Sequence, residues 1–504
     1  MAIIFQKVVA DAKKSFLSPK HVKDNFTESA YFSKKFTYIC NAHLYVDSMN
    51  NSKHSLVGKG YMLPFVLITF FFFLWGFARA ILDVLNPFFQ QSFQINKTQA
   101  SLIQFVTFTA YFLMAIPAGI LIRKYGTRRG VVTGLILFGG AALSFMLSRF
   151  SGGYIFWFYL LLLFVIGCGL ACLEVAANPY VTLLGKPETA ASRINRAQSF
   201  NGMGCIFGAL LGGAYCFSVE QPNISLLYLC IGVVVLLIAI LFSRVKLPEF
   251  VIEKKDTSPL SPSNGESSHS LSSTKEINHF KEQPLTLNAR SSIFNSKSSL
   301  LSHPLFVFGL FALFCYEVAE IAIASFYINY ATENNMAQWI STFINDSTGM
   351  MLNSHLVASI VLSVGLFLFM CGRFAGSWIM RFIKAEKVLF ACAIGTVLMT
   401  AFVVLDIHIV SFVASILIFV FEAIMFPTIF ALSIKGLGSL TQKASAVLMM
   451  TPIGGAVGSV LMGMAADHRN MTFSFFVPLV AFSVILIYTL TILRKEKLIQ
   501  RDVQ

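Results

Sequence analysis

The sequence predicts an all-α, polytopic membrane protein with twelve transmembrane helices in two six-helix halves. Three observations support this fold class: the chain is poor in charge, its apolar residues form long runs, and a polar segment divides those runs into two sets. Only 12% of the 504 residues are charged, whereas a soluble domain carries roughly a quarter. This composition argues against a soluble protein of several domains.

The apolar runs have the length of membrane-spanning helices, as at residues 61–77, 154–172 and 226–242. A helix of about 17 or more apolar residues crosses ~30 Å of hydrocarbon. Backbone amides in lipid must be bonded within their own segment, which favours helices over strands. The expected spans are residues 61–83, 99–122, 130–148, 154–182, 197–217, 224–243, 304–331, 353–381, 387–405, 409–434, 444–465 and 473–493.

Polar segments flank and separate the two sets of spans. The central one is rich in Ser, Lys and Glu, which is typical of a disordered linker. The first segment lacks a signal-peptide pattern, and Met49, which opens a short polar leader, is an alternative start to Met1. The expected parts are a polar cytoplasmic N-terminal extension (1–60), an N-terminal half (61–243), a cytoplasmic linker (244–303), a C-terminal half (304–493) and a cytoplasmic tail (494–504).

Basic residues occur in alternate loops. Residues 221–225 and 331–353 contain no Lys or Arg. The loop after the second expected span, in contrast, carries Arg123, Lys124, Arg128 and Arg129. Basic loops lie on the cytoplasmic side, so both termini are expected there. The same rule accounts for the net charge of +14 without a nucleic-acid partner. We expect a monomer in the plasma membrane, which is the inner membrane of a bacterial cell.

The two halves share a short pattern. Glu174 precedes Pro179 by five residues in EVAANP, and Glu422 precedes Pro427 by five residues in EAIMFP. The two copies occupy corresponding positions, in the fourth and tenth expected spans. This indicates a duplicated six-helix unit, for which a substrate site between the halves near the membrane midplane is expected.

Several strings resemble those of a known transporter family. The loop at 119–129 is similar to the G-x-x-x-D-R-x-G-R-R/K signature of the major facilitator superfamily, with departures at Arg123 and Thr127. More specific strings lie at 173–179 (LEVAANP) and 425–430 (MFPTIF). They resemble the fucose permease-like branch of sugar–proton symporters, which includes glucose/galactose transporters. The resemblance implies the major facilitator fold, alternating access, and import of a fucose-, glucose- or galactose-like monosaccharide with H⁺.

Asp83 and Glu174 are carboxylates within or at the end of expected spans. An ionised carboxylate at mid-membrane costs ~2.5–3.5 kcal/mol on insertion scales, so such residues generally serve a function. The resemblance implies that these two couple proton movement to sugar binding. The alternatives are an ordinary carboxylate at a helix end for Asp83 and a structural ion pair for Glu174.

Further polar residues within the spans are candidates for sugar contacts. Amides offer both donors and acceptors to sugar hydroxyls, although they also bond helices to one another. An indole ring can stack on a sugar or simply pack. Besides Arg79, the substrate-binding candidates are Trp75, Gln104, Asn178, Gln198, Asn201, Glu320 and Asn329.

Arg79 is a departure from the fucose permease-like pattern, which has a neutral residue near this position. It lies four residues before Asp83 and therefore on the same helix face. Arg79 could compete with a proton for Asp83, or it could bind a carboxylate or phosphate on the substrate. A third interpretation is that it only neutralises Asp83 and fixes the helix end.

The sequence gives no indication of an enzyme. It contains no phosphate-binding Gly-rich loop and no nucleophile motif. The nine Cys are scattered without metal-ligand spacing, so neither a metal nor a cofactor is expected beyond the coupling ion, H⁺ or alternatively Na⁺. Other interpretations are a carrier of anionic or amino sugars and a sensor that binds sugar without transport.

Overall fold

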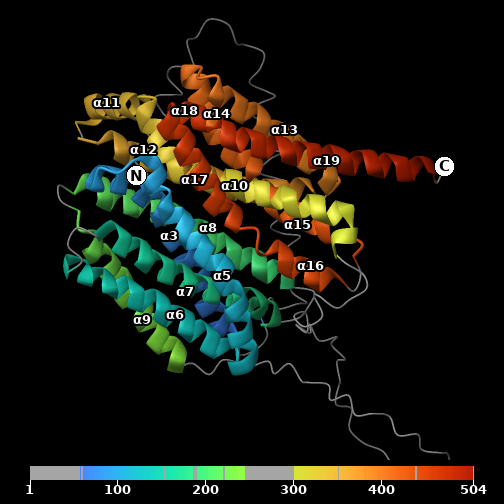
Figure 1. Ribbon diagram of the computed structural model, residues 1–504, viewed down its shortest axis with the longest axis horizontal. Coiled ribbons are helices and arrows are strands. Elements are labelled where there is room, and N and C mark those ends of the chain that lie inside the picture. Colours follow the sequence, from blue (N-terminus) through green and yellow to red (C-terminus); the bar gives the residue numbers. More distant parts are fainter. Residues whose placement is uncertain are drawn as a thin grey trace, which may run out of the picture. The chain divides into compact units, whose positions relative to one another are not determined.

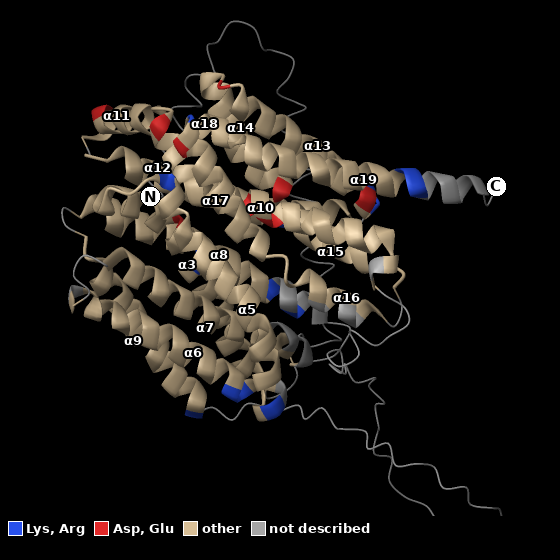
Figure 2. Ribbon diagram, in the orientation of Figure 1, with Lys and Arg blue, Asp and Glu red and all other residues tan. Residues whose placement is uncertain are grey.

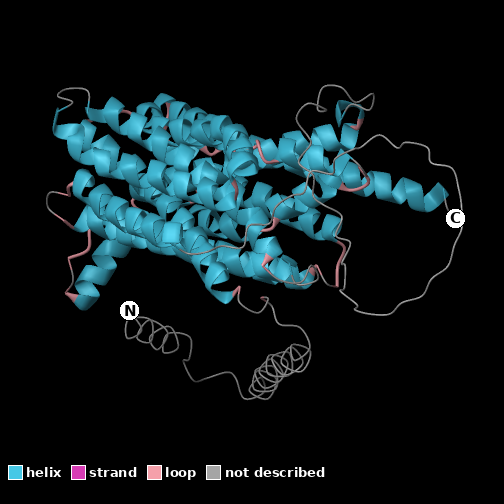
Figure 3. Cartoon of the chain, turned by 90° about the horizontal axis from the view of Figure 1, so that it is seen from below, coloured by secondary structure: helices cyan, strands magenta, loops and turns pink. Residues whose placement is uncertain are grey.

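The computed structural model describes residue 57 and residues 61–150, 155–184, 190–219, 222–244, 300–349, 351–380, 382–437 and 440–502. Within these ranges the regular structure is α-helix with short 3₁₀ turns, and no strand occurs (Figure 3). The all-α fold class is therefore confirmed. The expected N-terminal extension, its alternative start at Met49 and nearly all of the expected linker lie outside the described residues.

The helices form an N-terminal and a C-terminal group, coloured blue to green and yellow to red in Figure 1. The first group contains α3 (Met62–Phe93), α4 (Lys97–Ala100), α5 (Leu102–Tyr125), α6 (Thr127–Ser144), α7 (Ile155–Leu183), α8 (Ala190–Ser218) and α9 (Ile224–Arg244). The second contains α10 (Pro304–Glu333), α11 (Met336–Thr348), α12 (Ser354–Ile379), α13 (Ala385–Val404), α14 (His408–Glu422), α15 (Met425–Ile434), α16 (Thr441–Leu448), α17 (Ile453–His468), α18 (Met471–Ser474) and α19 (Phe476–Asp502).

Eleven helical segments of the described chain are long and apolar enough to cross a membrane. The one expected span that is not among them, the eleventh at 444–465, is divided between α16 and α17. Pro452 explains the division, because its missing amide hydrogen cannot bond the carbonyl of Leu448 four residues earlier. The Thr451 hydroxyl donates to that carbonyl instead, at 2.8 Å.

The first helix is longer than expected. The sequence places the end of this span at residue 83, but α3 continues to Phe93. Asp83 therefore lies inside the helix and is buried, with 6% of its surface exposed. The interpretation of Asp83 as an ordinary carboxylate at a helix end is wrong. The apolar residues Val84, Leu85, Phe88 and Phe89 extend the helix, and Pro87 does not end it. At the other end of the chain, α19 continues through most of the expected tail.

Glycines allow the first and fifth helices of each half to pack closely. A Cβ atom on Gly204 of α8 would overlap the backbone carbonyl of Phe73 on α3. In the second half, a Cβ atom on Gly458 of α17 would overlap the carbonyl of Val318 on α10. Small residues at such crossings let helix backbones approach within lipid. The correspondence between α3–α8 and α10–α17 supports the duplication inferred from the sequence.

The two halves meet mainly through four helix pairs: α3 with α10, α5 with α17, α8 with α12, and α4 with α17. Phe108 of α5, Ile321 of α10 and Ala456 of α17 form an apolar cluster across this interface. The Ser359 hydroxyl of α12 donates to the carbonyl of Ala209 on α8 at 2.6 Å. Acidic residues also appear midway along α10, beside this interface (Figure 2).

Candidate functional site

Ionisable side chains from both halves meet where α3 faces α10. The charge of Arg79 on α3 interacts with those of Glu317 and Glu320 on α10. It also interacts with Asp83 on the same helix and with Glu174 on α7. The structure thus brings both proton-coupling candidates and two substrate-binding candidates into one neighbourhood, as the duplicated architecture leads one to expect.

Arg79 forms an ion pair across the interface between the halves. Its Nη2 donates to both carboxylate oxygens of Glu320, at 2.7 Å each. The side chains are 26% and 13% exposed, respectively. Among the described residues Arg79 forms this ion pair with Glu320 and none with Asp83, because the long guanidinium side chain extends to α10 rather than along its own helix.

Asp83 instead bonds within the N-terminal half. Its Oδ1 accepts a hydrogen bond from Nε2 of Gln104 on α5, at 2.9 Å. Gln104 is itself buried, with 1% exposed. The contact joins α3 to α5. It uses one of the two N–H groups of Gln104, a residue expected from the sequence to bind sugar.

Trp75 and Glu174 lie on either side of a residue that the sequence analysis did not identify. The Trp75 indole N–H donates to the hydroxyl of Tyr111 on α5, and Tyr111 also interacts with the charge of Glu174. Glu174 is half-buried. It makes no hydrogen bond or ion pair within the described part of the chain, so its interpretation as a structural ion pair is not supported. No sequence pattern marks Tyr111, because tyrosines are common in apolar helices.

The remaining amide candidates occupy different surroundings. Asn201 of α8 donates from Nδ2 to the carbonyl of Phe72 on α3 at 3.1 Å, beside the close packing of these helices. Gln198 is half-buried. The side chain of Asn178 lies outside the described residues. Asn329 is nine residues from Glu320 along α10, or ~13 Å at the rise of an α-helix, and therefore lies apart from the ionisable cluster.

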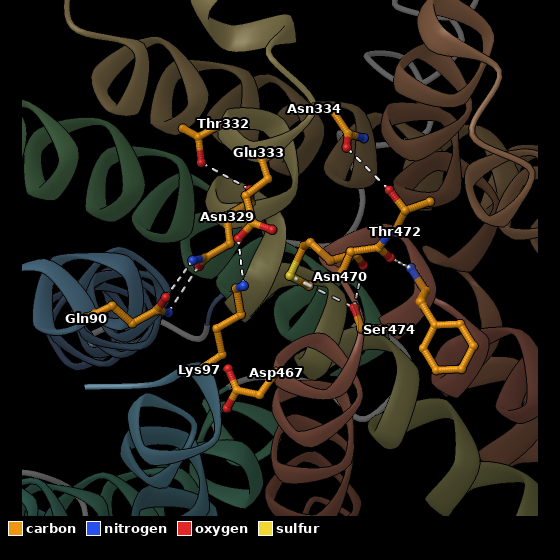
Figure 4. Close-up of polar contacts among 12 residues, drawn as sticks. Gln90, Lys97, Asn329, Thr332, Glu333, Asn334, Asp467, Asn470, Thr472 and Ser474 are labelled. Carbon is orange, nitrogen blue, oxygen red and sulfur yellow. Dashed lines mark hydrogen bonds and ion pairs between the residues drawn. The ribbon is translucent and has the colours of Figure 1, made fainter. Parts of the chain in front are cut away.

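Hydrogen bonds join α3 and α10 from the ionisable cluster to the end where α3 finishes. Asn86 Nδ2 donates to the Ser325 hydroxyl at 2.7 Å. Further along, Asn329 Nδ2 donates to Gln90 Oε1 at 2.8 Å (Figure 4). Each bond joins the two halves. Asn329 therefore takes part in a polar contact between helices.

A carboxylate on α17 completes the closure at this end. Asp467 accepts hydrogen bonds from the backbone N–H groups of Lys97 and Thr98, at 3.0 and 2.8 Å, and from the Thr98 hydroxyl at 2.6 Å. Lys97 Nζ also pairs with Glu333 of α10 at 2.9 Å (Figure 4). We call Asp467, Lys97, Thr98 and Glu333 the end latch. In this conformation the latch holds the halves together where α3 and α10 finish.

Asp467→Ala is expected to open this end. The loss of three bonds to a solvent-exposed carboxylate should raise the ratio of open to closed molecules about tenfold, or ~1.4 kcal/mol. Spin labels on the exposed residues Gln94 and Gln338 would report this as a larger population of long distances. Asp346→Ala, at an exposed carboxylate of α11, is the control and should leave the distribution unchanged. Identical distributions in both variants would show that Asp467 does not hold the end closed.

The comparisons with known proteins agree on one family. The family model for the Major Facilitator Superfamily matches residues 68–451. A glucose/galactose transporter of Brucella abortus is 31% identical over 453 residues, which cover 88% of this chain and 97% of the relative. An L-fucose-proton symporter of Escherichia coli is 31% identical over 460 residues, which cover 85% and 93%, respectively.

Solved structures give the same result. The crystal structure of a variant of the E. coli fucose:proton symporter superposes with a TM-score of 0.57 at 29% identity, covering 85% of this chain and 98% of that one. The xylose transporter XylE of E. coli superposes with a TM-score of 0.60, covering 85% and 94%. At 10% identity the XylE match concerns the fold alone.

Proposed function

The chain belongs to the Major Facilitator Superfamily, and from this premise we propose that it imports a monosaccharide in symport with protons through alternating access. Relatives that match most of the chain are named for glucose, galactose and L-fucose, so a sugar of this kind is the proposed substrate. The relatives are transporters, in agreement with the expectation that the chain is not an enzyme.

The observation that carries the proposal is the position of Glu174. Its half-buried carboxyl group has no fixed partner in the described part of the chain, yet it interacts with the charge of Arg79. A carboxyl group in this situation can gain or lose a proton without breaking a salt bridge. Asp83, held by Gln104, is the second proposed coupling residue. H⁺ is the proposed coupling ion, as in the symporter relative.

The Arg79–Glu320 pair is the proposed centre of sugar recognition. Together the two side chains offer donors and acceptors, which sugar hydroxyls require. The bonds from Arg79 to both oxygens of Glu320 support a neutral sugar over an anionic one, because the guanidinium already has a carboxylate partner. The other proposed sugar contacts are Trp75, Gln104, Asn178, Gln198, Asn201 and Asn329.

The proposed location is the plasma membrane, with both termini in the cytoplasm. Basic residues end α5 and begin α6, where Arg128 and Arg129 lie in the first turn. This supports a cytoplasmic position for that end of the helices. The end latch then lies on the extracellular side. The protein is proposed to act as a monomer.

Uptake into proteoliposomes tests the proposal. Labelled L-fucose, D-glucose and D-galactose would be offered with an inward pH gradient, an inward Na⁺ gradient, or no gradient. We expect accumulation of one of these sugars under the pH gradient and only equilibration without it. Accumulation under the Na⁺ gradient alone would establish Na⁺ coupling instead. Preference for an acidic or amino sugar would change the substrate class, and binding without uptake would indicate a sensor.

A further inference from the structure

Glu422 is a buried carboxyl group that the proposed mechanism does not yet use. It is the last residue of α14, and none of its surface is exposed. Neither Oε1 nor Oε2 has a hydrogen-bond partner in the described part of the chain. The hydroxyl of Tyr316 on α10, which interacts with the charge of Glu422, is also buried without a partner. Glu422 thus contrasts with Glu320, whose two oxygens both bond to Arg79.

The charges that interact with that of Glu422 come from three other helices. They are Glu320 on α10, Arg79 on α3 and Arg373 on α12. Helix α13 also packs against α14, but its charged residues, Glu386 and Lys387, lie in its first turn. Arg79 is already paired with Glu320, and no ion pair to Glu422 forms within 4.0 Å among the described residues.

A buried carboxylate without hydrogen bonds is costly. The effective penalty for an unpaired buried ion is several kcal/mol, whereas a neutral acid pays only the smaller cost of an unsatisfied polar group. The charge of Glu320 further opposes a second negative charge nearby. In this conformation Glu422 therefore holds its proton.

The structure also contains a partner for the deprotonated form. Pro427 has no amide hydrogen, so the carbonyl of Ala423, four residues earlier, has no helical donor. Arg373 Nε donates to this carbonyl at 3.2 Å. Its guanidinium lies over the ring of Phe369, 4.6 Å from the centroid, and forms no ion pair in the described part of the chain. Ala423 is adjacent to Glu422 in the sequence, and the charge of Arg373 already interacts with that of Glu422, so Arg373 is the cation placed to pair with the deprotonated form.

We propose that Glu422 is a second proton-carrying group, in the C-terminal half, which holds a proton in the conformation seen here and releases it when Arg373 pairs with it. A proton from water forms an O–H bond on the carboxylate, and that bond later breaks to return the proton to water on the other side. The group corresponds to Glu174, which also lies five residues before a proline. The inference rests on the proposed proton symport, taken as one proton handled by Glu174 together with Asp83, and extends it to two protons for each sugar.

The ratio of protons to sugar tests the inference. Sugar uptake and internal acidification would be measured together in proteoliposomes of the wild-type protein and of Glu422→Gln. We expect a ratio of two for the wild type and one for the variant. The limit of accumulation at a gradient of one pH unit should then fall from ~100-fold to ~10-fold, since one pH unit acting on one proton gives a factor of about ten. Glu386→Gln, a matched change near the start of α13, should keep the wild-type ratio.

The possible outcomes separate this inference from the proposed function. No proton movement with sugar in the wild type would reject both. A wild-type ratio of one would overturn the inference about Glu422 but not the proposed function. This measurement does not depend on whether any variant folds. An unchanged ratio in Glu422→Gln would also overturn it. Glu422→Asp, which keeps a carboxyl group, should retain the ratio of two. A ratio of one in this variant would show that the size of the side chain, and not proton binding by it, determines the ratio.

Discussion

Glu174→Gln is expected to abolish the accumulation of sugar that proton binding at Glu174 drives. The amide keeps the size of the side chain but cannot carry a proton, so a pH gradient would no longer drive uptake through this site. The ~10-fold accumulation per pH unit that this proton provides should be lost, and only accumulation driven through Glu422 should remain. Exchange of labelled for unlabelled sugar should continue, because exchange requires no net proton movement. Uptake and exchange in the same proteoliposomes would measure both effects.

Glu386→Gln is the matched control, because Glu386 is a carboxylate in the first turn of α13, away from the proposed proton site. This variant should still accumulate sugar. If Glu174→Gln also concentrates sugar at the wild-type rate, Glu174 does not couple the proton to the sugar. If both accumulation and exchange are lost, the side chain is required for substrate binding or folding, and the coupling role has no support.

Breaking the Arg79–Glu320 pair is expected to have the largest effect on stability. Removal of one partner from a buried pair leaves the other charge uncompensated, at a cost of ~3–5 kcal/mol. Because the Arg79 side chain is 26% exposed, the cost for this pair should lie near the lower end of that range. Arg79→Gln and Glu320→Gln should therefore each destabilise the purified protein by about 3 kcal/mol. The double variant should regain most of this loss, since no unpaired charge remains.

A double-mutant cycle on denaturant unfolding would measure the interaction, together with sugar binding for each variant. The control is the pair between Lys435 and Glu386, at 3.0 Å, in which Lys435 is 71% exposed. An exposed pair contributes at most ~1 kcal/mol, so Lys435→Gln should change stability little. Equal losses for Lys435→Gln and Arg79→Gln would show that the interhelical pair is not effectively buried.

The sequence predicts the helices well because lipid imposes a simple requirement on length and polarity. It predicts their ends less well, as α3 and Asp83 show. Apolar residues after Asp83 continue the helix, and a single carboxylate does not end a span when a neighbouring helix supplies a hydrogen bond. The division between α16 and α17 follows from Pro452, a local signal that hydropathy over a long window does not register.

Contacts across the interface could not be predicted from the sequence. The i to i+4 spacing correctly places Arg79 and Asp83 on one face of α3, but it gives no information about Glu320 on another helix. For the same reason the Trp75–Tyr111 contact was not foreseen. Glu422 was visible in the repeated Glu-x₄-Pro pattern, whereas its lack of hydrogen bonds depends on where α10 and α12 place their side chains.

The end latch also limits how fast the protein can work. If alternating access operates, the bonds between Asp467 and the start of α4 must break once in every cycle. A closed state that is more stable by ~1.4 kcal/mol, with an unchanged transition state, opens about ten times more slowly. Tighter closure therefore lowers turnover, while looser closure lets ions leak. The strength of this latch should accordingly lie within a narrow range set by these two demands.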